Sequence, residues 1–449
     1  MNKERIASAL RAASDTRCFL FGDNILNKVD SVFGECFGSK KAVIIADQNT
    51  YKVVGEAVRA SISTRLAAEP LIFPGQPTLY ADFNNVSLLE NQLSAFDAVP
   101  VVLGSGTLND ITKLAAHRLG RPYMVVATAA SMDGYTSFGA AITQNGFKQT
   151  ISCPAPRGIV ADLQVLAKAP ARMNSTGYGD LLGKLTAGAD WIVADGLEIE
   201  PIEPVAWSLV QDSLQQWTGH PASLQSGDPE AIENLFEGLI MSGLAMQNTK
   251  TSRPASGSEH QFSHLWEMQA IGHGKPEHPH GFKVGIGTIA SAALYEQLFA
   301  HDLTRLDVDN LCQKWPSIEE VVQKVRASFD IPALIEKTVE ECSAKYITPE
   351  MLRQRLTLLK QRWPSLREKL KTQLKPAVQV REQLQLAGCP TDPAEIGLNL
   401  VQLRQSYFQA RYIRRRYTVL DLAFETGLLE DCVGKLFKPG GFWPTHSKH

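Results

Sequence analysis

The chain has 449 residues, with 45 Lys and Arg against 47 Asp and Glu, so its formal net charge is -2. The length exceeds a typical domain of roughly 100–200 residues, which predicts at least two domains. The balanced charge argues against a nucleic-acid partner, and no apolar run reaches the ~20 residues that span a bilayer. We therefore expect a cytoplasmic protein with small-molecule partners and no membrane partner. The seven dispersed cysteines are typical of reduced thiols.

In the first third of the chain, short apolar runs alternate with amphipathic segments. The expected strands are 41–46, 70–73, 98–103 and 123–127, and the expected helices are 51–61, 84–95 and 108–119. Strands that alternate with helices at this spacing pair in parallel through crossover connections. The pattern predicts an α/β, Rossmann-like dinucleotide-binding domain over residues 1–165.

From Gly177 onward the apolar residues follow a helical period. Asp228 and Pro229 are a typical N-cap and first helical residue, and the segment after them carries an apolar face. Residues 166–449 are therefore expected to form an all-α metal- and substrate-binding domain, with a loose tail from Pro439. We interpret the basic stretches 351–375 and 414–416 as solvated helix faces.

A glycine-containing turn follows the apolar strand 98–103. Such a turn lets the backbone approach a phosphate, and the next helix offers free N–H groups there. The candidate cofactor-binding residues in it are Gly104, Gly106, Thr107, Asn109 and Asp110. The spacing is not G-x-G-x-x-G, so an ordinary strand-to-helix turn is an equal alternative.

Asp47 ends the strand 41–46. A carboxylate at that place accepts hydrogen bonds from a ribose hydroxyl and repels a 2′-phosphate, which favours NAD over NADP. It equally suits the N-cap of the following helix.

The segment 128–137, after the strand 123–127, is rich in small and hydroxyl-bearing residues. At the carboxyl end of a parallel strand it is expected where ligands bind. Thr128, Ser131 and Ser137 would then contact cofactor and Asp133 would reach substrate, although a plain turn requires no ligand.

Histidines cluster between residues 260 and 280, which suggests a metal or acid/base centre. His260 and His264 are four residues apart and share one face of a helix, and a loop returns the chain to His280. Asp180, which we expect beside a helix start, is the candidate carboxylate. Two imidazoles and a carboxylate hold a divalent cation with open positions. Structural histidines are the alternative, and His273 and His278 are interpreted as loop residues.

Several motifs together resemble the glycerol-1-phosphate dehydrogenases, within the iron-containing alcohol dehydrogenase and dehydroquinate synthase-like superfamily. The motifs are 104–110 (GSGTLND), 128–134 (TAASMDG) and 179–184 (GDLLGK). Segments 252–264 (SRPASGSEHQFSH) and 412–421 (YIRRRYTVLD) resemble the bacterial branch.

The resemblance implies reversible, NAD(P)H-dependent reduction of dihydroxyacetone phosphate to sn-glycerol 1-phosphate by a homo-oligomer. It implies one divalent ion (zinc, nickel or iron) on Asp180, His260 and His280. It also implies dinucleotide contacts at Asp47, around Gly106 and in 128–137. Asp133, His264 and Asp180 are then the residues that contact substrate and support catalysis.

The chain departs from the wider family at Ser105, where a third glycine is usual, and at Lys283, where an acidic residue is frequent. Lys283 serves a phosphate or faces solvent, and the same pair of alternatives applies to Lys184. Three other functions stay open: a dehydrogenase of another polyol or sugar phosphate, a cyclase or lyase that uses NAD transiently, and a protein that only binds a cofactor or partner.

Overall fold

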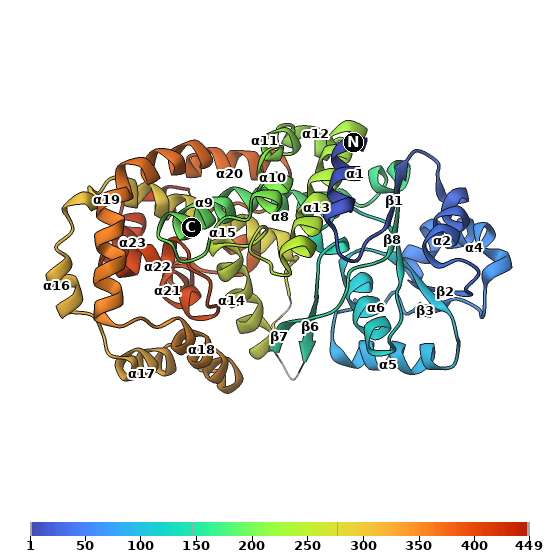
Figure 1. Ribbon diagram of the computed structural model, residues 1–449, viewed down its shortest axis with the longest axis horizontal. Coiled ribbons are helices and arrows are strands. Elements are labelled where there is room, and N and C mark those ends of the chain that lie inside the picture. Colours follow the sequence, from blue (N-terminus) through green and yellow to red (C-terminus); the bar gives the residue numbers. More distant parts are fainter. Residues whose placement is uncertain (1, 145–146, 276, 447–449) are drawn as a thin grey trace. The chain divides into compact units, whose positions relative to one another are not determined.

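A computed structural model describes residues 2–144, 147–275 and 277–446 (Figure 1). Contacts divide the chain into two compact units: Met1–Leu181 with Val205–Ser252, and Leu182–Pro204 with Arg253–His449. The first unit thus includes helices from beyond the predicted domain boundary after residue 165. The predicted boundary separates a cofactor-binding domain from a metal- and substrate-binding domain, and this functional division stays a prediction.

The first unit contains a six-stranded parallel sheet in the order β1-β8-β5-β4-β2-β3. The four predicted strands are confirmed, and the sheet gains β1 and β8 at one side. The strands are β1 (Cys18–Gly22), β2 (Ala42–Asp47), β3 (Leu71–Phe73), β4 (Val99–Gly104), β5 (Met124–Ala127) and β8 (Gly158–Asp162). The predicted α/β fold class is therefore correct.

Helices cover this sheet because its central strands are apolar on both faces. Val32 and Phe33 of α2 (Val29–Phe37) and Val58 of α4 (Glu56–Ser61) belong to a core cluster with Ile44 and Val101. Two other helices, α5 (Phe83–Ser94) and α6 (Gly106–Arg118), pack against each other, and α6 contacts β4. The predicted helix 51–61 begins earlier, since α3 (Gln48–Thr50) and η2 (Tyr51–Gly55) lead into α4.

The rest of the first unit is a hairpin and a set of helices. The hairpin pairs β6 (Ala140–Gln144) with β7 (Phe147–Ile151). The helices are α1 (Lys3–Ala12), α7 (Leu163–Ala167), α8 (Ala171–Leu182), α10 (Pro204–Gln211), α11 (Leu214–Trp217), α12 (Pro221–Gln225) and α13 (Pro229–Thr249). The predicted start of α13 is confirmed: Asp228 Oδ1 accepts from Ala231 N at 2.8 Å, and Pro229 is the first residue of the helix.

The second unit is helical, with no strand among its described residues (182–204, 253–275 and 277–446), as predicted. Its longer helices are α9 (Lys184–Gly196), α14 (Ser258–Gly272), α15 (His280–Phe299), α17 (Ile318–Ser328), α18 (Pro332–Lys345), α19 (Pro349–Gln373), α20 (Ala377–Leu386) and α21 (Leu400–Gln409). The shorter ones are α16 (Val308–Gln313), α22 (Val419–Glu425), α23 (Leu429–Phe437) and α24 (Phe442–His446).

Two expectations about the surface of this unit have different outcomes. The stretch 351–375 is helical up to Gln373 and has a buried apolar stripe. Its basic residues are only partly solvated: Lys369 and Lys371 are exposed, whereas Arg355 pairs with Glu425 and Arg367 donates to the Phe299 carbonyl at 2.8 Å. The tail from Pro439 is not loose over its described residues, because α24 buries Trp443, whose Nε1 donates to the Tyr407 hydroxyl at 3.0 Å. Residues 447–449 of that prediction lie outside the described residues. In the described part of the chain, no helix has the length and apolar character needed to cross a membrane.

Candidate active site

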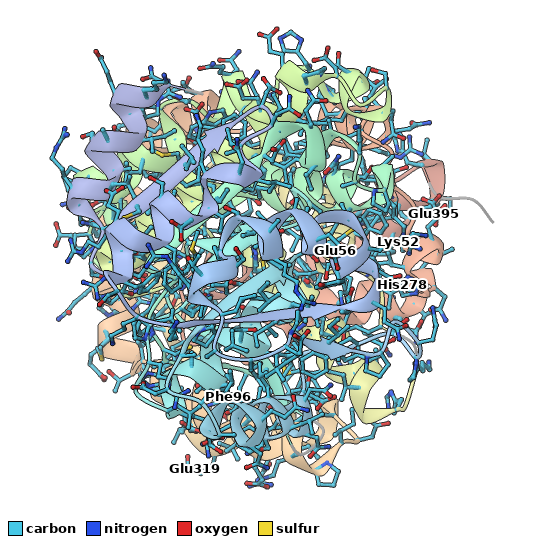
Figure 2. The ribbon with its side chains drawn as sticks, turned by 90° about the vertical axis from the view of Figure 1, so that its right-hand side faces the viewer. Lys52, Glu56, Phe96, His278, Glu319 and Glu395 are labelled. Carbon is cyan, nitrogen blue, oxygen red and sulfur yellow. The ribbon has the colours of Figure 1, made fainter. Side chains whose placement is uncertain are left out.

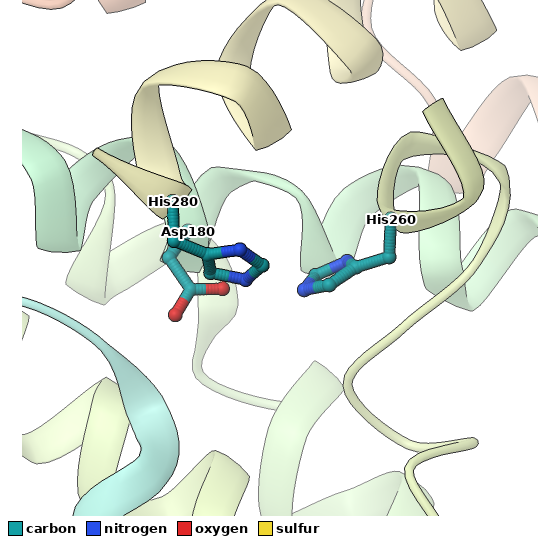
Figure 3. A group of neighbouring side chains, drawn as sticks. All are labelled: Asp180, His260 and His280. Carbon is teal, nitrogen blue, oxygen red and sulfur yellow. The ribbon is translucent and has the colours of Figure 1, made fainter. Parts of the chain in front are cut away.

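Three side chains offer ligand atoms to one point: Asp180, His260 and His280 (Figure 3). One ligand atom from each lies within 4.8 Å of the other two. Asp180 is fully buried in the last turn of α8. The sequence analysis expected Asp180 beside the start of a helix. Asp180 instead lies near the end of α8, and Gly183 separates α8 from the start of α9. The ligand set itself is the one the resemblance implied.

The histidines are brought together by the helices α14 and α15. His260 and His264 share a face of α14, with ring centroids 5.9 Å apart. His280 is the first residue of α15, and its ring lies 5.3 Å from that of His260 and 5.7 Å from that of His264. Gly287 allows this approach, since a Cβ there would lie 2.5 Å from the Glu259 carbonyl oxygen.

Buried carboxylates stand behind all three imidazoles. Nδ1 of His260 lies 2.8 Å from Glu259 Oε1, and Nδ1 of His280 lies 2.8 Å from Glu267 Oε1. The second oxygen of Glu267 lies 3.1 Å from Nδ1 of His264. A carboxylate only accepts, so each Nδ1 carries the proton and each Nε2 keeps a lone pair. This arrangement orients histidines for metal ligation, so the residues fit a divalent cation.

Glu259 is held ionised although it is fully buried. Burial alone would raise the pKa of its carboxyl, but hydrogen bonds from His260, Thr186 and the Gly257 N–H lower it overall. Asp190 supports the same turn by accepting from Ser258 N at 2.6 Å. A negative charge behind His260 raises the basicity of that ligand.

His264 lies beside the ligand set and is not a member of it. Burial, with Arg414 nearby, lowers its pKa to about 3, so the ring is neutral at pH 7. Its side chain is 19% exposed, which leaves the neutral ring reachable by a small molecule. Lys283 is buried and pairs with Glu267 at 3.1 Å and Glu277 at 3.3 Å, so it does not face solvent. Lys184 is also fully buried.

The glycine-containing turn lies at the carboxyl end of β4. The helix α6 begins at Gly106, two residues before the predicted start, so Gly106 and the half-buried Thr107 form its first turn. A Cβ on Gly106 would lie 2.8 Å from Met132 Cε, so the turn packs closely against the side chain of Met132. Gly104 is paired with the next strand, since its carbonyl accepts from Thr128 N at 3.2 Å.

Asn109 and Asp110 are buried and hydrogen-bonded within the first unit. Asn109 donates to the Gly134 carbonyl at 3.1 Å and accepts from the Tyr123 hydroxyl at 3.0 Å. Asp110 accepts from Ala141 N at 3.1 Å and pairs with Lys113 at 3.7 Å. These contacts brace the loop, and a direct contact of either side chain with cofactor stays a prediction.

The loop 128–137 is held mainly by one buried lysine. Lys113 Nζ donates to the carbonyls of Gly134 (3.0 Å), Ser137 (3.0 Å) and Gly139 (2.9 Å). Thr128, Ser131 and Ser137 are buried, each below 9% exposed.

In the same loop, Asp133 accepts from Ser242 Oγ at 2.8 Å, and its N–H donates to Asp180 Oδ2 at 3.0 Å. The structure therefore ties the predicted substrate residue Asp133 to the predicted ligand Asp180.

Asp47 is the N-cap of α3. Its Oδ1 accepts from Thr50 N at 2.7 Å, and its own N–H donates to Thr50 Oγ1 at 3.1 Å. The cap alternative is thus correct as local structure. The ribose contact stays a prediction, because a half-buried carboxylate has a second oxygen.

The sequence reasoning missed the residues that support the site: Glu259, Glu267 and Lys113. Two of them had a readable signal, since Glu259 adjoins His260 and Glu267 follows His264 by three residues on one helix. His273 and His278 do lie outside helices, as expected. His273 pairs with Asp330 at 3.1 Å, and His278 is labelled in Figure 2.

Residues 20–170 match the family described as iron-containing alcohol dehydrogenase. The chain is 35% identical over 305 residues to glycerol-1-phosphate dehydrogenase (NAD(P)+) of Halalkalibacterium halodurans, covering 65% of this chain and 76% of the relative. It is 30% identical over 403 residues to the enzyme of the same name from Geobacillus thermodenitrificans, covering 87% and 88%. A probable glycerol dehydrogenase from Sinorhizobium meliloti 1021 has the same fold, with a TM-score of 0.59 at 15% identity and coverage of 94% and 98%.

Proposed function

Because the chain belongs to the glycerol-1-phosphate dehydrogenase family, we propose that it reduces dihydroxyacetone phosphate to sn-glycerol 1-phosphate. The reaction consumes NAD(P)H and one proton and releases NAD(P)+. The observation that carries the proposal is the ligand set Asp180, His260 and His280, in which carboxylates fix both imidazoles. A protein that only binds a cofactor has no chemical need for that combination.

The cofactor is assigned to the carboxyl edge of the parallel sheet, where α/β proteins of this kind bind dinucleotides. The first turn of α6, at Gly106 and Thr107, offers N–H groups to the pyrophosphate. Asp47 is assigned to the ribose. Thr128, Ser131 and Ser137 complete the binding loop, which Asn109 and Asp110 brace.

When bound, a divalent cation supplies the positive charge that polarises the ketone, and the nicotinamide supplies the hydride. Asp180, His260 and His280 would hold that cation. This ligand set accommodates zinc, nickel and iron, so the metal is a matter for measurement. A cytoplasmic homo-oligomer belongs to the same proposal and rests on the family alone.

The residues beside the ligands have separate tasks. His264 is neutral and directs Nδ1–H to Glu267, so its Nε2 accepts a hydrogen bond from a substrate hydroxyl. This favours orientation over proton donation for His264. Asp133 is fixed by Ser242 and is assigned to a substrate hydroxyl. Asp180 is assigned to substrate as well as to the metal. The proton for the product oxygen then comes through water.

The experiment measures loss of NADH and NADPH absorbance after dihydroxyacetone phosphate is added to protein loaded separately with zinc, iron or nickel. A chelator-treated sample is the control. Metal-dependent oxidation supports the proposal, and chiral analysis of the product identifies the sn-1 isomer. No oxidation with any metal, under conditions where cofactor binding is measured, contradicts it. Glycerol, other polyols and other sugar phosphates are then tested, and turnover without net NADH loss would indicate a cyclase.

A further inference from the structure

The three consecutive arginines 414–416 do not form the solvated helix face that the sequence suggested. They lie in the irregular segment between η7 (Ala410–Tyr412) and α22. Arg415 is 56% exposed and pairs with Glu340 at 3.0 Å and Glu341 at 3.2 Å. Arg414 and Arg416 are half-buried instead. The exposure alternates along the segment: Arg414 and Arg416, here called the inward arginines, are less exposed than Arg415.

Arg414 lies within electrostatic reach of the histidine cluster. Its positive charge helps to lower the pKa of His264, and the Glu267 carboxylate is close enough to raise the pKa of Arg414. Burial lowers the pKa of its guanidinium, although Glu341 and Glu267 oppose that effect. Across residues 2–144, 147–275 and 277–446, the Arg414 side chain makes no hydrogen bond and no ion pair with the protein. A guanidinium has five N–H donors, so the half-buried Arg414 keeps donors for an anion.

Arg416 adds a second positive charge at the same place. Its Nη1 donates to the Ser256 carbonyl at 2.6 Å, which fixes the side chain beside the start of α14. Burial and the neighbouring cations Arg253 and Arg414 together lower its pKa to about 9, although Glu200 and Glu259 oppose that effect.

Lys283 is a further candidate for an anion contact near the histidines, but carboxylates already neutralise its charge. Lys283 pairs with Glu267 and Glu277. Its charge serves the carboxylate that orients His264 and His280. The inward arginines therefore remain the better donors to an anionic group beside the ligands.

We propose that Arg414 and Arg416 bind the phosphate group of the substrate, an assignment that rests on the proposed function. A phosphate dianion accepts several charge-assisted hydrogen bonds, and planar guanidinium groups suit it better than ammonium groups do. Binding would satisfy the donors of Arg414 and offset the repulsion between Arg414 and Arg416. The pair would also select a phosphorylated triose over the same triose without phosphate.

The test compares Arg414→Gln with Arg415→Gln, a matched change of the outward neighbour. In the metal-loaded enzyme, Arg414→Gln should raise KM for dihydroxyacetone phosphate roughly 10- to 100-fold and weaken inhibition by inorganic phosphate. Turnover of unphosphorylated dihydroxyacetone should fall much less than turnover of the phosphorylated triose. Arg415→Gln should change neither quantity, and Arg414→Lys should recover part of the phosphate affinity. The same two quantities are measured for Arg416→Gln. The melting temperature of this variant is compared with that of the wild type, because Arg416 also donates to the Ser256 carbonyl.

An unchanged KM for dihydroxyacetone phosphate in Arg414→Gln would overturn the proposal. So would equal losses on the two trioses, because that pattern indicates a structural role. If the wild type does not reduce dihydroxyacetone phosphate at all, the proposed function fails separately. Calorimetric titration with inorganic phosphate then decides on the arginines: weaker binding in Arg414→Gln supports an anion site, and equal binding rejects it.

Discussion

The polar side chains around the predicted cofactor loops of the first unit and the histidines of the second unit act in opposite ways. In the first unit, the side chains near the predicted cofactor loops hold the backbone: Lys113 binds three carbonyls, and Asp47 caps a helix. In the second unit, His260 and His280 offer their own nitrogen atoms, and buried carboxylates hold those rings. A loop of backbone amides suits a long, uniform ligand such as a dinucleotide. A cluster of oriented imidazoles suits a cation, whose ligands require fixed geometry.

The comparison predicts the largest loss where a ligand nitrogen is removed. His260→Ala should lose bound metal and lower kcat/KM by at least about 1000-fold, since the cation supplies several kcal/mol of transition-state stabilisation. His273→Ala, at an exposed histidine paired with Asp330, should keep both. Metal analysis by mass spectrometry and NADH consumption measure the two effects. Wild-type metal content in His260→Ala would remove that residue from the ligand set.

In the first unit, the corresponding loss should appear in stability. Lys113→Met removes three charge-assisted hydrogen bonds and leaves Asp110 buried without its cation, so the free energy of unfolding should fall by about 3 kcal/mol or more. Lys52→Met, at an exposed lysine labelled in Figure 2, is the control and should have almost no effect. Urea denaturation measures both variants. Equal stability of the two would mean that the loop does not depend on Lys113.

A third variant tests whether the carboxylates of the second unit orient the rings. Glu267 accepts from His264, His280 and Lys283 at once, and a glutamine would turn an N–H₂ group toward one of these donors. Glu267→Gln should therefore weaken metal affinity roughly 10- to 100-fold. The control is Glu319→Gln, at an exposed position labelled in Figure 2. Competition with a chelator of known affinity gives the metal Kd. The orienting role of Glu267 is refuted if both variants hold metal as tightly as the wild type.

Burying charge also makes the second unit sensitive to pH. Burial raises the pKa of Glu425 from 4.5 to about 7, even though Arg355 pairs with it and the Tyr417 hydroxyl donates to it at 2.8 Å. Between these two values the folded chain binds a proton that the unfolded chain releases. This contribution to stability is complete below pH 4.5 and is lost as the pH rises through 7.

Glu425→Gln removes that titration. From pH 4.5 to 8, the free energy of unfolding of the variant should therefore improve relative to the wild type by about 1 to 3 kcal/mol. Chemical denaturation at a series of pH values measures the difference. A difference that stays constant over this range would show that Glu425 is ionised throughout.

The parts of the molecule that follow from local pattern were predictable. Alternating apolar runs predicted β2 to β5, and the Asp228-Pro229 pair predicted where α13 begins. The pairing of His260 with His264 followed from helical spacing. The supporting contacts were not predictable, because they join distant segments: Lys113 to 134–139, and Glu267 to His280 across two helices. The partial burial of Arg414 was not predictable for the same reason, since a run of three arginines ordinarily indicates a solvent-exposed segment.

The sequence left two interpretations of Asp47 open, a ribose contact and a helix N-cap. The smallest of the predicted effects distinguishes between them. Asparagine caps helices as well as aspartate does, so Asp47→Asn keeps the cap and removes only the charge. Asp47→Ala loses both and should cost about 1 kcal/mol of stability. If the carboxylate binds the ribose, both variants should weaken NADH binding and discriminate less against NADPH, since the charge no longer repels a 2′-phosphate. Fluorescence titration with the two cofactors measures this. Unchanged affinities in Asp47→Asn would restrict Asp47 to its cap, and the first unit would then bind cofactor through backbone and hydroxyl groups alone.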